Sequence, residues 1–159
     1  MRRMLLLAVL AVFGVFVYYA AFRGIRIWAL LPVLAALVAI WYTVSFVVTR
    51  KMVEKARGDV SFLFIRCSLI TPDGNELVPG ALAVTETELV FYARKNSSGG
   101  VIPRWSCFVT EIEGYSIEKV DDHHKGLSLS LTGGTSAVKF ASSSFTKKES
   151  LFRNAIGWD

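Results

Sequence analysis

Two long runs of apolar residues dominate the first fifty positions of the chain. Residues 4–22 and residues 27–49 contain no formal charge. At about 1.5 Å of rise per residue, helices of these lengths reach roughly 28 and 34 Å, and the hydrocarbon core of a bilayer is about 30 Å thick. The pattern predicts a hairpin of two transmembrane helices with a basic juxtamembrane segment over residues 1–57, as in a multi-pass membrane protein.

Basic and aromatic residues at the ends of these runs predict how the hairpin is oriented. Lys and Arg concentrate on the cytoplasmic side of a membrane, and Tyr and Trp at its interfaces. The residues predicted to anchor and orient the hairpin are Arg2, Arg3, Tyr18, Tyr19, Trp28, Arg50, Lys51, Lys55 and Arg57. We therefore expect an integral protein of a bacterial inner or cell membrane, with both termini and the second domain in the cytoplasm.

A cleaved signal peptide is the alternative interpretation of the first run. Its basic start precedes an apolar stretch that ends in Ala20 and Ala21. Cleavage requires small residues at both recognition positions, and Tyr18 and Tyr19 interrupt that pattern. A second apolar run directly after the first also favours the hairpin.

From residue 58 onward the apolar positions alternate with a period of two, which is typical of half-buried β-strands. In the first such segment, Leu63, Ile65 and Cys67 fall on one face. Gly, Pro, Asn and Asp gather between the alternating segments and indicate turns. The seven predicted strands are 61–69, 80–85, 88–95, 104–110, 115–120, 127–131 and 137–141.

The period changes to that of a helix near the C-terminal end. Thr146 and Glu149 have the spacing of a capping box, which predicts the start of a helix. Gly157 predicts its end. The apolar positions between them, at helical spacing, are Leu151, Phe152, Ala155 and Ile156. A short amphipathic helix needs a surface to cover, and we expect it to close the open end of the sheet in a soluble β domain over 58–159.

The segment Gly80–Tyr92 has the pattern G-x-L-x-V-T-x-x-x-L-x-F-Y. This pattern resembles a strand pair of GRAM-like and bacterial PH-like domains, which belong to the pleckstrin-homology superfold. A helical hairpin followed by such a domain is also similar to membrane-flanked bacterial PH-like proteins. The resemblance implies a mostly-β barrel of about seven antiparallel strands with a C-terminal helix. A generic antiparallel barrel plugged by a helix is the alternative.

Charge is distributed unevenly along the chain. Residues 1–57 hold eight basic residues and one acid, whereas residues 58–159 hold ten basic residues and twelve acids, so the net charge of +5 is the sum of +7 and −2. A nucleic-acid-binding domain would carry its basic residues on the folded part, so this class of partner is not expected. The loop after the first strand contains Asp73 and Glu76 and no basic residue, which argues against phosphoinositide head-group binding of the PH type.

The residues that could carry chemistry are few. His123 and His124 stand beside two aspartates, where a solvated hairpin turn is a simpler interpretation than a metal site. Cys67 and Cys107 fall on predicted core faces, where a reduced thiol is inert. The sequence contains no G-x-S-x-G elbow and no Gly-rich phosphate loop, so no catalytic, cofactor or metal site is predicted.

These observations predict a non-enzymatic, membrane-anchored interaction domain that acts as an accessory or scaffolding subunit of a membrane protein complex. The expected partners are membrane lipids and either other proteins or a second copy of the chain. Docking is expected at the sheet edges, at the apolar helices, or at a loop containing Asn96, Ser97, Ser98, Val101 and Ile102. The alternative is a lipid-binding module in which the basic segment near residue 50 binds anionic lipids.

Overall fold

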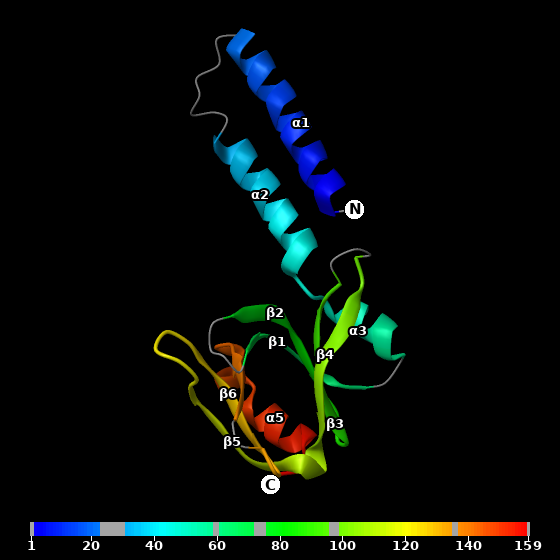
Figure 1. Cartoon of the computed structure of the whole chain (residues 1–159), viewed down its shortest axis with the longest axis vertical. Helices are drawn as coiled ribbons and strands as arrows, with labels where there is room; N and C mark the ends of the chain where they lie inside the picture. The colour runs from blue at the N-terminus through cyan, green and yellow to red at the C-terminus, as the bar shows by residue number, and fades with distance from the viewer. Residues whose placement is uncertain are drawn as a thin grey trace. The chain divides into compact units, whose positions relative to one another are not determined.

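The structure is a computed structural model that describes residues 2–22, 31–58, 61–71, 76–95, 99–134 and 137–158, without the side chains of 2–9 and Val44. Backbone contacts divide the chain into two units (Figure 1). The first consists of Met1–Val47 with Lys95–Gly99, and the second of Val48–Arg94 with Gly100–Asp159. The predicted orienting residue Trp28 and the predicted loop residues Asn96, Ser97 and Ser98 lie outside the described residues.

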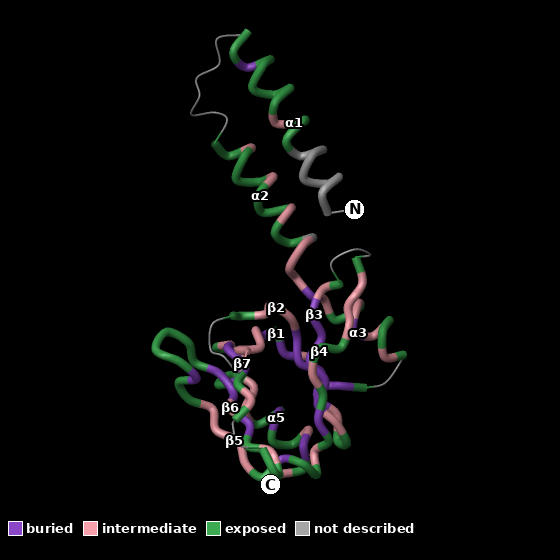
Figure 2. Tube along the Cα trace, in the orientation of Figure 1, coloured by how far each residue is buried: buried purple, intermediate pink, exposed green. Residues whose placement is uncertain are grey.

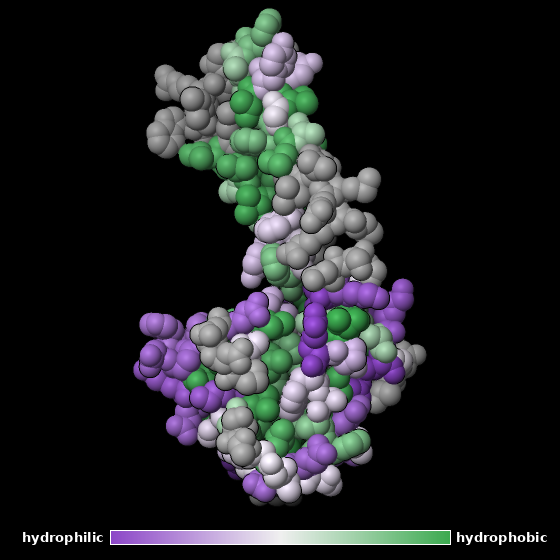
Figure 3. Space-filling view, viewed as in Figure 1, coloured by the Kyte–Doolittle hydropathy of each residue, from purple (hydrophilic) through white to green (hydrophobic). Residues whose placement is uncertain are grey.

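The helices of the first unit are α1, Arg2–Phe22, and α2, Leu31–Phe46. Hydrophobic side chains gather over both helices in the space-filling view (Figure 3). Among the described residues, however, no helix combines the length and the apolar character that crossing a membrane requires. The predicted two-pass transmembrane anchor and the integral-membrane location are therefore wrong. The predicted placement of both termini in the cytoplasm was derived from that anchor and loses its basis with it.

For the second apolar run, the physical reason for this correction lies in the length of α2. The second apolar run was expected to stay helical to residue 49, but α2 has 16 residues and ends at Phe46. A helix of that length reaches about 24 Å, less than the roughly 30 Å of a hydrocarbon core.

The second unit contains one antiparallel sheet of seven strands in the order β4-β3-β2-β1-β7-β6-β5. Its strands are β1 Leu63–Ile70, β2 Leu77–Val84, β3 Glu88–Arg94, β4 Val101–Phe108, β5 Ile112–Lys119, β6 Lys125–Leu131 and β7 Val138–Ala141. A short 3₁₀ turn, Val109–Glu111, joins β4 to β5. The alternating pattern thus predicted the seven antiparallel strands correctly. The largest boundary differences are at the starts of β2, β4 and β5, each of which begins three residues before its predicted start. In β4, for example, Val101 is already paired with Arg94 on β3.

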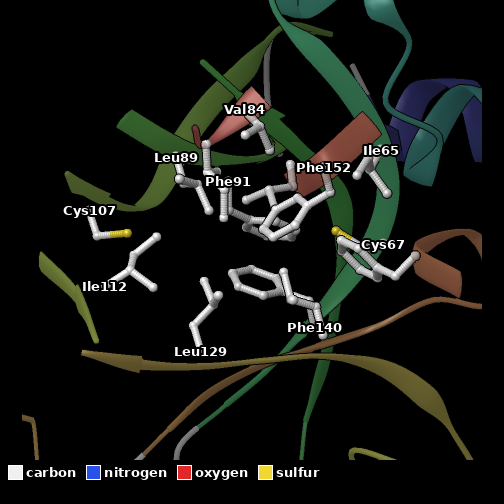
Figure 4. Close-up of a cluster of buried hydrophobic side chains, with 14 of the residues drawn as sticks. Ile65, Cys67, Val84, Leu89, Phe91, Cys107, Ile112, Leu129, Phe140 and Phe152 are labelled. Carbon is white, nitrogen blue, oxygen red and sulfur yellow. The ribbon is translucent and has the colours of Figure 1, made fainter. Parts of the chain in front are cut away.

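The main core contains buried side chains from all seven strands and from the C-terminal helices. Figure 2 marks the buried positions along the curved sheet and on α5. Phe140 on β7 is at its centre. Its ring lies 5.7 Å from the ring of Phe91 and 5.2 Å from the ring of Trp105, measured between centroids. The labelled side chains in Figure 4 converge on this ring from both halves of the sheet. The strand faces predicted from alternation are therefore the faces that the core uses.

A short helix, α3 Arg50–Arg57, covers the opposite face of β1–β3. Its one fully buried side chain, Val53, joins Val48 from the preceding segment in a second apolar cluster with Phe62 and Tyr92. Helix α3 ends at Gly58, which has a φ of 83° and so adopts a backbone conformation that favours glycine. The sheet is therefore packed on both faces along this half.

Two helical turns close the chain: α4, Ser144–Lys147, and α5, Glu149–Ala155. The predicted capping box is wrong, because the chain becomes helical before Thr146, which lies inside α4. The fully buried ring of Phe145 explains the earlier start, since the first turn places that ring in the core. The predicted stop is confirmed: Gly157 has a φ of 69°, and the N–H of Trp158 donates to the carbonyl oxygen of Arg153 at 3.1 Å.

Candidate functional site

The sheet of the second unit has two edge strands, β4 and β5, because no pairing between them closes it in the described residues. An edge strand presents unpaired backbone N–H and C=O groups, to which another extended segment can bond. The two edges differ in how well they are protected. Each edge strand has one register shift in its pairing, between Phe91 and Tyr92 on β3 for β4 and between Ile112 and Gly114 on β5 itself. Beyond that, Pro103 removes a backbone donor from β4, whereas β5 contains no proline. The β5 edge is thus the more open of the two.

The hydrogen-bond pattern of the β5–β6 hairpin determines which backbone groups of β5 face outward. The N–H of Val120 donates to the carbonyl oxygen of His124 at 3.0 Å, so this pair is hydrogen-bonded across the hairpin. The carbonyl oxygen of Lys125 accepts from the N–H of Ser142 at 2.9 Å, so Lys125 bonds on the side of β7. Hydrogen-bonded and non-hydrogen-bonded pairs alternate along an antiparallel ladder.

Together with the observed register, this alternation divides the residues of β5 into those whose backbone groups bond to β6 and those whose backbone groups face the open edge. Ser116 and Glu118 stand opposite Ser128 and Gly126 and bond to β6. Three residues between and beside them direct their backbone N–H and C=O groups to the open edge: Tyr115, Ile117 and Lys119. The open edge therefore offers a row of donors and acceptors at every second residue.

A groove of about 540 Å³, which we call the β5 groove, runs beside this edge. It is lined by Tyr115, Ser116, Ile117, Glu118, Glu149, Arg153 and Trp158. The ring of Tyr115 lies between two others, 5.4 Å from Phe152 and 5.5 Å from Trp158. Its hydroxyl oxygen accepts a hydrogen bond from Arg153 Nε at 3.1 Å. That hydrogen bond raises the pKa of the Arg153 guanidinium above its ordinary value.

The composition of the groove suits an amphipathic strand. Tyr115 and Ile117 share the inner face of β5 and pack against the core, and both side chains remain partly accessible. Glu118 and Lys119 are exposed at the end of the strand. Arg153 is held by Tyr115 and lies 3.7 Å from Glu149, between Nη2 and Oε1. An added strand would meet apolar surface along its inner face and both signs of charge at its ends.

The basic residues near position 50 have a different arrangement from the one the sequence predicted. Arg57 is only 8% exposed, and its Nη2 lies 2.7 Å from Glu88 Oε1 on β3. Arg50 bonds to Glu54 within α3, and both guanidinium groups lie over the ring of Phe62. Lys51 and Lys55 are exposed. Two of the four basic side chains of α3 therefore fasten the helix to the sheet.

The other predicted site residues fall outside the β5 groove. Val101 and Ile102 belong to β4, where they pair with Arg94 and Ala93. Tyr18 and Tyr19 lie on α1 and are exposed, and Arg2 and Arg3 begin that helix. Within the described part of the second unit, the structure thus does not bring the predicted site residues into one cluster.

The turn that follows β5 is organised by Asp121. Its Oδ1 accepts the backbone N–H groups of His123 and His124, and the ring of His124 lies 2.7 Å from Oδ2. Desolvation raises the pKa of the Asp121 carboxyl, but the hydrogen bonds from His123 and His124 together lower it below its ordinary value. Hydrophilic side chains gather over this turn (Figure 3). Within the described ranges, no three metal-ligating side chains come together.

Both thiols are buried and unpaired. Burial raises the pKa of Cys67, and it also raises the pKa of Cys107 to about 12, with a further contribution from the charge of Glu111. A thiol must ionise to act as a nucleophile or a metal ligand. Neither cysteine is therefore poised for chemistry near neutral pH.

A second cavity, of about 700 Å³, lies where β1 ends and β7 begins. Its walls include Leu69, Trp105 and Val138, and Asp122 and Lys139 also line it. The chain segments next to it in sequence, 72–75 and 135–136, lie outside the described residues. The β5 groove is in contrast bordered by β5 and α5, both of which are fully described.

No known protein family matches the chain, and no curated protein matches it. The resemblance to PH-like domains accordingly stays a prediction. Sequence reasoning identified β5 as a strand but missed the roles of Tyr115, Arg153 and Trp158. The alternation of Tyr115 and Ile117 with polar residues was the available signal, but which strand forms an edge depends on pairings that no local pattern contains.

Proposed function

We propose that the second unit is a non-enzymatic interaction module, which binds an extended protein segment by adding it as a strand to β5. The observation that carries this proposal is the combination of an open strand edge with an adjoining groove. Backbone hydrogen bonds along β5 would supply affinity, and the groove would select alternate side chains of the segment. Such a module would serve as an accessory or scaffolding component of a protein complex.

The proposal assigns a PH-like fold to the second unit, and two features support this assignment. The seven strands follow one another in an antiparallel sheet and are followed by a C-terminal helix, as the resemblance implies. The segment Gly80–Tyr92, on which the resemblance rests, forms the hairpin of β2 and β3. The buried, protonated thiols support the absence of catalysis, because they remove the two strongest candidate nucleophiles.

Site-specific photo-crosslinking in the native host tests the docking surface. A photoreactive amino acid replaces Glu118 at the β5 edge of the full chain, and Ser130, exposed on the neighbouring strand β6, provides the matched control position. We expect a crosslinked adduct from position 118 and none from position 130. Because the N–H of Lys119 points outward, Lys119→Pro should abolish the adduct while leaving the fold intact, whereas Lys119→Ala should retain it.

The test depends on a difference in crosslinking between positions 118 and 130. Equal crosslinking from both positions, or an adduct from position 118 that survives Lys119→Pro, would contradict docking by strand addition. Thermal unfolding of each variant, followed by circular dichroism, verifies that the sheet is intact.

A further inference from the structure

We infer that the segment which occupies the β5 edge is the β5 strand of a second copy of this chain. This inference rests on the proposed docking function and names its partner. Two identical strands can pair antiparallel about a twofold axis only if the sequence complements itself when it is read backwards. The sequence of β5 from Glu113 to Lys119 is EGYSIEK.

Placing the twofold axis at Ser116 gives a self-complementary register. Tyr115 then stands opposite Ile117 of the second copy, and Ile117 opposite the second copy's Tyr115. Glu113 is the extra residue at the register shift between Ile112 and Gly114. In this arrangement it lies beside Lys119 of the second copy, and by symmetry this approach of opposite charges occurs twice. Aromatic residues beside β-branched residues, and opposite charges, are the favourable cross-strand pairs. Glu118 stands opposite Gly114, which offers no side chain to clash with it.

The backbone agrees with this register. Tyr115 and Ile117 direct their N–H and C=O groups to the open edge, as the alternation in the β5–β6 hairpin requires. Tyr115 of each copy would face Ile117 of the other, and the two residues would exchange backbone N–H to C=O hydrogen bonds. Ser116 bonds to β6, so Ser116 and its symmetry mate would form the central non-hydrogen-bonded pair, with their Cα atoms about 4.5 Å apart.

The next symmetric register is less favourable. With the axis at Ile117, Tyr115 would face Lys119 and Ser116 would face Glu118, so no pair of opposite charges would form. The groove also favours the axis at Ser116. In that register the added strand directs its own Tyr115 and Ile117 to the inner face. These side chains would pack beside Ile117 and Tyr115 of the first copy, which are partly accessible.

Cysteine crosslinking of the full chain tests this geometry. The Cα separation at a central non-hydrogen-bonded pair lies within the range of a disulfide. Under mild oxidation we expect Ser116→Cys to give a disulfide-linked dimer, while Ser130→Cys on β6, which has no symmetry mate nearby, should give no disulfide-linked dimer. The native thiols do not interfere, because both are buried.

Charge reversal provides the second arm of the test. Glu113→Lys or Lys119→Glu alone turns two attractive pairs into two repulsive ones, which should weaken self-association about tenfold or more. The double variant Glu113→Lys with Lys119→Glu restores both pairs and should restore the dimer. Sedimentation of the full chain measures association in each variant.

The outcomes separate this inference from the docking function. If Ser116→Cys does not crosslink and the double variant does not rescue the single ones, the second copy is not the occupant. A specific adduct of another protein at position 118 would then retain docking at β5 and overturn only the self-pairing. Absence of both results would overturn both proposals.

Discussion

Replacing Gly126 by Ala is expected to lower the free energy of unfolding by about 3 kcal/mol. Gly126 lies on β6 where β7 passes closely, and a Cβ built there would overlap the backbone carbonyl oxygen of Phe140. Backbone atoms cannot rotate aside as a side chain would, so the two strands would have to separate. Urea unfolding followed by circular dichroism measures the change.

Gly114→Ala is the matched control for this substitution. Gly114 lies on the neighbouring strand β5, and a Cβ added there meets no atom within 4 Å. The control should therefore change the free energy of unfolding by less than about 0.5 kcal/mol. Equal stability of the Gly126 and Gly114 variants would show that β6 and β7 do not approach as closely as described.

Phe140→Ala should cost about 3–5 kcal/mol of unfolding free energy. The ring is fully buried and contacts the rings of Phe91 and Trp105, so its removal leaves a cavity between the two halves of the sheet. The same unfolding measurement gives the loss, and near-ultraviolet circular dichroism should show a weakened signal from Trp105.

Phe108→Ala provides the comparison, since that ring is 60% exposed at the end of β4. It should cost less than about 1 kcal/mol. The predicted order of the two variants follows from burial alone, and a larger effect at Phe108 than at Phe140 would refute the assignment of the core.

The alternation of apolar residues predicted the strands because one face of each strand packs against a common core. Ile65, Cys67, Leu127 and Leu129 alternate with more polar neighbours, and all four are buried in that core. The same reasoning assigned the turn at Asp121. What it could not supply was strand order, since the neighbour of a strand depends on residues far away in sequence. The open edge at β5 and its groove follow from that order.

The failures of the sequence reasoning have a common origin. It treated 27–49 as one helix because the run lacks charge, but the chain leaves helical geometry after Phe46 and Val48 is buried against the sheet unit. It began the last helix at Thr146, whereas burial of Phe145 requires an earlier turn. In both cases a tertiary contact prevailed over a local pattern.

Amide hydrogen exchange along β5 tests the open edge most directly. In the Glu113→Lys variant, where self-pairing is weakened, we expect fast exchange at Tyr115, Ile117 and Lys119 and slow exchange at Ser116 and Glu118, because only the second set bonds to β6. Slow exchange at all five amides would mean that the chain itself covers the edge. The reverse alternation would mean that β5 presents the other set of groups, and either result would contradict the account.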